Sequence, residues 1–107
     1  MDQSVFEKSL TLLIINNIPK FRNSYDLTKV LARKFGIIEL VDLTQSLEKD
    51  NLISRNLKEG IHHYNITEKG ESYLKENYSV LHSETTNKYP EQSEFINTIF
   101  RQSDTKQ

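Results

Sequence analysis

Two stretches decide the fold: Leu47-Glu48-Lys49-Asp50-Asn51-Leu52-Ile53-Ser54-Arg55 and, a little later, Tyr64-Asn65-Ile66-Thr67-Glu68-Lys69-Gly70-Glu71-Ser72-Tyr73-Leu74. Residues 52–57 and 61–66 read as two strands, because Lys58-Glu59-Gly60 between them is typical of a tight turn. A helix ends before the turn-forming pair Asp50-Asn51, and Thr67 is a residue type that caps the start of a helix. These stretches predict a β-hairpin between two helices.

Three helices are predicted upstream of the hairpin, over residues 4–17, from about 24 to 36, and from about 38 to 49. The first begins with the capping-box pattern Ser4-Val5-Phe6-Glu7 and does not continue through Pro19. Gly36 suits the end of the second helix, because glycine adopts a left-handed backbone at little cost. The third has an apolar stripe of Leu40, Leu43 and Leu47.

After Thr67 a fourth helix is expected, then a polar loop over residues 83–90, and a last short helix from Pro90 to Gln102. We expect a first domain over residues 1–80 and an extension over residues 81–107 with a disordered end. The last helix carries an apolar stripe that we assign to a homodimer interface: Phe95, Ile96, Ile99 and Phe100. The alternative is packing of this stripe against the first or fourth helix of its own chain.

The order helix, helix, helix, hairpin, helix resembles that of the PadR-like and MarR-like winged-helix regulators. The resemblance covers about residues 4–80 and is most specific at the Tyr-x-Ile-Thr-x-x-Gly sequence of residues 64–70. It implies a mostly α-helical winged helix-turn-helix with a two-stranded wing and C-terminal helices. The implied function is that of a DNA-binding transcriptional regulator without catalytic activity, with double-stranded DNA as its partner.

In the pattern of the resembled family the third helix enters the major groove, while the second helix and the wing hold phosphates. Carried over by position, the third helix would present Glu39, Asp42, Gln45 and Ser46, together with Thr44 and Lys49. Gln45 can pair with adenine, and Glu39 or Asp42 can accept a hydrogen bond from cytosine N4, but the helix has no arginine for guanine. The phosphate-binding candidates are Arg22, Asn23, Ser24, Lys29, Arg33, Lys34, Arg55 and Lys58.

Charge is distributed unevenly, although the net charge is only −1. Residues 20–36 hold five cations against Asp26, a balance of +4, whereas residues 37–51 hold Lys49 against four carboxylates, a balance of −3. The basic block favours phosphate contact. The acidic third helix favours the alternative function, a winged-helix module that docks a basic surface of a protein partner.

Other functions find little support. The chain has no cysteine and no apolar run near the ~20 residues that span a bilayer, so we expect a cytoplasmic protein that does not enter the membrane. Adjacent His62 and His63 point to opposite faces of a strand and cannot share a metal ion. No phosphate loop or nucleophile motif is present, so we expect no enzyme, metal or cofactor, and the sequence identifies no effector.

Overall fold

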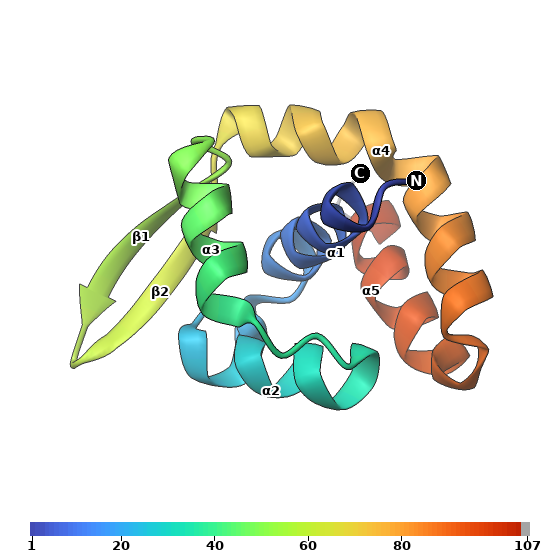
Figure 1. Ribbon diagram of the computed structural model, residues 1–107, viewed down its shortest axis with the longest axis horizontal. Helices are drawn as coiled ribbons and strands as arrows, with labels where there is room; N and C mark the ends of the chain where they lie inside the picture. Colours follow the sequence, from blue (N-terminus) through green and yellow to red (C-terminus); the bar gives the residue numbers. More distant parts are fainter. Residues whose placement is uncertain (106–107) are drawn as a thin grey trace.

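The computed structural model describes residues 1–105 and shows three helices, an antiparallel hairpin and further helices (Figure 1). The helices are α1 (Gln3–Asn17), α2 (Ser24–Phe35), α3 (Leu40–Lys49), α4 (Glu68–Lys88) and α5 (Ser93–Thr105), the strands are β1 (Ile53–Lys58) and β2 (Ile61–Ile66), and the short 3-10 helices are η1 (Pro19–Phe21) and η2 (Pro90–Gln92). The predicted fold class, a winged helix-turn-helix with a two-stranded wing, is confirmed.

Local capping fixes most helix boundaries. The side chain of Asn23 accepts a hydrogen bond from the backbone N–H of Asp26, and Gly36 ends α2 with a φ of 67°. The Thr67 hydroxyl accepts from the backbone N–H of Gly70 at 3.0 Å, as expected for the cap of α4. The capping box predicted at Ser4 is wrong, because the Asp2 carboxylate accepts the hydrogen bond of the Val5 N–H and caps α1 instead.

The wing turns back over two residues with positive φ, Glu59 at 52° and Gly60 at 78°. Positive φ at both central residues matches the twist of the two flanking strands, so the hairpin stays paired to its tip. At its base the hairpin is held to the start of α2, where the Tyr64 N–H donates to the Arg22 carbonyl at 2.8 Å and Asn23 bridges to His63. The wing therefore has a fixed position relative to α2.

The core forms around α1, which lies at the centre of the molecule with α2 and α3 on one side and α4 and α5 on the other (Figure 1). The apolar side chains of α1 are buried on all sides of the helix, which explains why its sequence is apolar almost throughout residues 10–15. On α3 the predicted stripe is confirmed as buried: Leu40, Leu43 and Leu47. Among the described helices, none combines the length and apolar sequence that crossing a bilayer requires.

The loop predicted over residues 83–90 is wrong, because α4 continues to Lys88. Leu81 and Thr85 lie on the inner side of this helix and are fully buried. The Thr85 hydroxyl donates to the Leu81 carbonyl, so the buried hydroxyl is satisfied within the helix. A segment that looks polar in sequence is therefore helical, since only one residue in four needs to face the core. The domain boundary expected after residue 80 falls inside this continuous helix.

The expectation that the apolar stripe of the last helix faces a second chain is wrong for its buried members Ile96, Ile99 and Phe100. They belong to the same core cluster as α1 and α4, and the partly buried Phe95 packs beside Phe21 and Phe35. The alternative, packing within its own chain, is what the structure shows. These buried side chains therefore give no support to a homodimer. The expected disordered end of the chain extends beyond the described residues.

Candidate nucleic-acid interface

The outer face of α3 carries the residues predicted to read DNA. Because the leucine stripe faces the core, Glu39, Asp42, Gln45 and Lys49 are exposed, and Ser46 is half-buried at the edge. The assignment of Thr44 to this surface is wrong, because Thr44 is buried and its hydroxyl donates to the Leu40 carbonyl. In the part of the chain that the structure describes, the side chains of Asp42 and Gln45 take part in no hydrogen bond or ion pair. These polar groups are free to meet a ligand.

Two apolar residues that the sequence interpretation did not select lie on the same surface. Ile38, in the link before α3, is 78% exposed, and Val41, in its first turn, is 68% exposed. The exposure of Val41 follows from the helical periodicity of the sequence, because the buried stripe of Leu40, Leu43 and Leu47 leaves Val41 on another face. The sequence pattern places Ile38 inside the helix, but α3 begins two residues later, at Leu40.

A groove of about 570 Å³ separates the N-terminal half of α3 from the wing. Ile38, Val41 and Gln45 line one side; the other elements contribute Ser24, Thr28, Arg55, His62 and Tyr64. We call this concavity the α3–wing groove. It brings Ser24, predicted from sequence as a phosphate-binding residue, into the same surface as the exposed face of α3.

The wing contributes less positive charge than its sequence suggests. Arg55 Nε lies 3.3 Å from Glu48 Oε1 of α3, so this cation is already compensated by a carboxylate. Lys58 precedes the turn, is exposed, and takes part in no ion pair among the described residues. Phosphate contact by the wing would therefore depend on Lys58 more than on Arg55.

Two predicted phosphate-binding residues have structural roles. Arg22 donates through Nε to the Ile15 carbonyl at 2.6 Å and through Nη2 to the Asn16 carbonyl at 2.7 Å, so its guanidinium satisfies the last turn of α1. Asn23 caps α2 through Oδ1, and its Nδ2 donates to Asp26 and to the Lys20 carbonyl. The sequence held a signal for the role of Arg22, because a basic residue just beyond the end of a helix is placed to donate to the free carbonyls of its last turn.

Four further cations line a second concavity, which we call the basic cleft. It measures about 300 Å³ and is lined by Lys20, Phe21, Asp26, Lys29, Val30, Arg33 and Lys34. Within the described residues no carboxylate lies at ion-pairing distance from any of these four cations. The one acidic residue, Asp26, receives a hydrogen bond from Asn23 and keeps its negative charge. The cleft therefore holds four cations against one carboxylate, a local excess of positive charge.

Three of these cations lie near an aromatic ring, and for Lys29 and Lys20 the ring belongs to a residue nearby in the sequence. The Nζ of Lys29 lies 4.0 Å from the centroid of the Tyr25 ring, and that of Lys20 lies 5.8 Å from the Phe21 centroid. Cation–π contact orients an ammonium group without neutralising it, so both lysines can still attract an anion.

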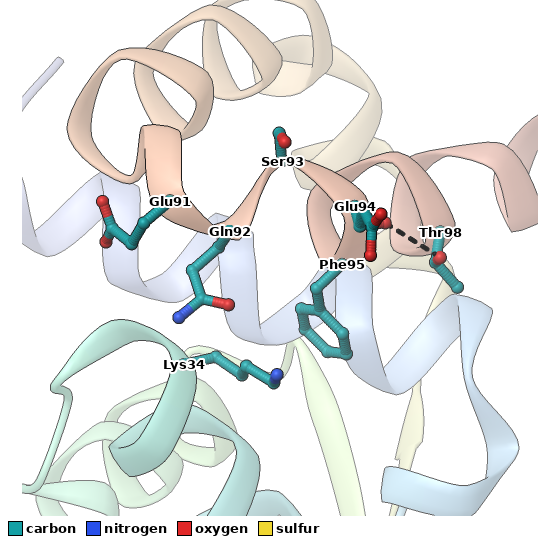
Figure 2. Close-up of a pocket in the computed structure, with 7 residues that line it drawn as sticks. All are labelled: Lys34, Glu91, Gln92, Ser93, Glu94, Phe95 and Thr98. Carbon is teal, nitrogen blue, oxygen red and sulfur yellow. Dashed lines mark hydrogen bonds between the residues drawn. The ribbon is translucent and has the colours of Figure 1, made fainter.

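Lys34 is less free than its neighbours, because it also borders a pocket of about 550 Å³ beneath η2 and α5 (Figure 2). Its ammonium group lies beside Phe95, 5.4 Å from the ring centroid. Glu91 and Glu94 line the same pocket, while the Thr98 hydroxyl donates to the Glu94 carbonyl. These two carboxylates lower the local positive potential, which makes Lys29 and Arg33 the stronger phosphate-binding candidates.

The sequence-predicted site is thus divided by α2. Ser24 and Thr28 face the α3–wing groove, whereas Lys29 and Arg33 face the basic cleft. His62 lines the groove, while the backbone of His63 pairs with that of Asn23 in an isolated antiparallel bridge. Among the described residues no three histidine or acidic side chains are grouped to hold a metal ion. Comparison with known proteins gives no match: no family model fits the sequence, and neither a curated protein nor a solved structure is significantly similar to the chain.

Proposed function

We propose that this chain is a winged-helix DNA-binding protein that acts in transcriptional regulation and carries out no catalysis. The observation that carries the proposal is the basic cleft of a protein whose net charge is −1. Four exposed cations line it beside the single carboxylate of Asp26, and none of the four forms an ion pair with any residue that the structure describes. The resemblance of residues 64–70 to the PadR-like and MarR-like regulators supports the same function.

Phosphate contacts supply most of the affinity in this proposal, and Lys29 and Arg33 provide them from α2. The exposed face of α3 enters the major groove, where Gln45 hydrogen-bonds to adenine and Asp42 accepts from cytosine N4. Lys49 and Lys58 add charge at the end of α3 and at the wing. Arg22 and Asn23 act indirectly, because they hold the start of α2 in place.

Salt-dependent binding to duplex DNA tests the proposal. We expect Lys29→Ala combined with Arg33→Ala to weaken binding to all duplexes and to flatten the slope of log K against log salt by about 2, since each phosphate contact contributes about 0.9. The matched control is Lys69→Ala combined with Lys75→Ala, which removes the same charge from exposed positions on α4. The control should keep the slope of the parent.

Equal slopes for the two double variants would show that the basic cleft does not hold phosphates. No binding of the parent at low salt would contradict DNA binding altogether.

A second candidate function, contact with a protein partner, is favoured by one observation. The exposed Ile38 and Val41 alternate with the carboxylates of Glu39 and Asp42, a surface that suits a basic and apolar polypeptide. In this case the parent would bind no duplex, and charge reversal at Glu39 and Asp42 would abolish capture of the partner.

A further inference from the structure

Two exposed apolar side chains at the start of α3 lie where a ligand could contact them. Ile38 and Val41 are 78% and 68% exposed, and both lie in the α3–wing groove beside Gln45. Val41 and Gln45 are four residues apart in α3, so they lie one above the other on the same side of the helix. The helix thus presents an aliphatic group and a free carboxamide side by side.

We propose that Val41 and Ile38 contact the C5-methyl groups of thymines in the major groove while Gln45 pairs with an adjacent adenine. The inference rests on the proposed DNA-binding function and adds to it the class of sequence recognised, duplexes rich in A·T pairs. In the major groove an A·T pair differs from a G·C pair by the thymine methyl, which takes apolar contacts, and by the N6 and N7 edge of adenine, which takes a glutamine.

The lack of a guanine-binding side chain on the exposed face of α3 also favours A·T pairs. Its exposed face offers no arginine, the side chain that most often binds guanine, and its lysine, Lys49, stands at the last residue of the helix. An α3 built to read G·C pairs from the guanine side would need such a donor near Val41 and Gln45. Asp42 and Glu39 can accept a hydrogen bond from cytosine N4, but neither can donate to guanine, so the preference for A·T pairs rests on the aliphatic pair and Gln45.

A protein partner is a poorer occupant of this surface. Each partner in a typical stable protein complex buries about 800 Å², mostly around a central apolar cluster. Here two aliphatic side chains stand among Glu39, Asp42 and Gln45, without an exposed aromatic group on α3. Single aliphatic side chains of this kind are sufficient for contact with a methyl group on a base edge.

Replacement of thymine by uracil tests the inference, because uracil keeps the hydrogen-bonding edge and lacks only the methyl group. The probes are a duplex of alternating adenine and thymine and the same duplex with deoxyuridine in place of thymidine. For each thymine methyl that the protein touches, we expect the parent to bind the uracil duplex about fourfold more weakly, the ratio that corresponds to one buried methylene-sized group.

Two variants test whether Val41 is the residue that contacts the thymine methyl group. Val41→Ala should bind the thymine duplex more weakly and should show a smaller thymine-to-uracil ratio than the parent. Val80→Ala, which shortens a valine that is 50% exposed on α4, should keep the ratio of the parent. Circular dichroism of both variants should match the parent, since both side chains are exposed.

Equal affinity of the parent for the two duplexes would overturn the methyl contact while leaving DNA binding intact. The methyl contact would also be overturned if Val41→Ala bound both duplexes more weakly but kept the thymine-to-uracil affinity ratio of the parent. If the parent binds neither duplex at low salt, the proposed function fails together with this inference, and the apolar pair belongs to a protein interface.

Discussion

The Asn17 side chain at the end of α1 donates through Nδ2 to the main-chain carbonyl of Ile99 in α5, at 2.7 Å and across 82 positions of sequence. Both groups are buried, so this hydrogen bond satisfies polar atoms that water cannot reach. Nearby, the Tyr78 hydroxyl donates to the Phe100 carbonyl. The C-terminal helix is therefore part of the same core as the winged helix and not an appendage beside it.

Shortening Ile99 should destabilise the whole domain. We expect Ile99→Ala to lower the free energy of unfolding by about 2–5 kcal/mol, the usual range for a fully buried aliphatic side chain. Urea denaturation followed by circular dichroism measures this loss, and Asn97→Ala on the exposed side of α5 should change it by less than about 0.5 kcal/mol. If the loss depended on protein concentration, the stripe would face a second chain after all.

Gly70 should not tolerate alanine, even though alanine is the better helix former. A Cβ at this position would lie 2.1 Å from the Leu52 carbonyl oxygen and 2.7 Å from Ile66 Cγ1. We expect Gly70→Ala to destabilise the fold by about 3 kcal/mol, the upper end of the range for overpacking. The control is Ser72→Ala, exposed on the same helix, which should be neutral or slightly stabilising. Thermal denaturation of the two variants compares them, and a stabilised Gly70→Ala would contradict the close approach of Leu52, just before β1, to α4.

Arg22 should contribute to stability and Arg33 to DNA affinity. Removing the Arg22 guanidinium leaves the Ile15 and Asn16 carbonyls without these donors, so Arg22→Ala should cost about 1–3 kcal/mol of unfolding free energy. Arg33→Ala should leave unfolding unchanged within about 0.5 kcal/mol, because its side chain is exposed. Urea denaturation separates the two roles. An Arg22→Ala variant as stable as the parent would return Arg22 to the set of phosphate-binding candidates.

Alkaline pH should weaken the packing of Tyr89. Burial, together with the negative charges of Glu7 and Glu91, raises the pKa of the Tyr89 phenol above its usual value, and its hydroxyl donates to the Phe35 carbonyl at 2.9 Å. The neutral phenol is favoured in the folded state, so its contribution is complete below the unfolded pKa of about 10 and is lost as pH rises through the higher folded pKa.

The measurement is the urea midpoint at about pH 8 and about pH 11, spanning the titration of an ordinary phenol. The parent should lose more stability between these two values than Tyr89→Phe, in which the titrating group is absent. Equal losses in the two proteins would mean that Tyr89 titrates as an exposed tyrosine.

Much of the fold could be predicted from the sequence because the responsible interactions are local. Glu59 and Gly60 form the wing turn, Thr67 caps α4, and Gly36 ends α2, each through contacts with residues at most five positions away. The leucine stripe of α3 likewise follows from helical periodicity. For the same reason, the exposure of Asp42 and Gln45 could be predicted from the sequence.

Only the tertiary structure decided the length of α4 and the roles of the basic residues. The polar segment after residue 82 is helical because Thr85 is buried in the core, an environment that periodicity does not reveal. Arg22 binds carbonyls six and seven residues earlier because the turn at Pro19 folds the chain back on the end of α1. Arg22 caps a helix, Arg55 pairs with a carboxylate, and Arg33 forms no ion pair with any described residue. These roles depend on which groups folding brings within a few ångströms, and sequence spacing does not specify that distance.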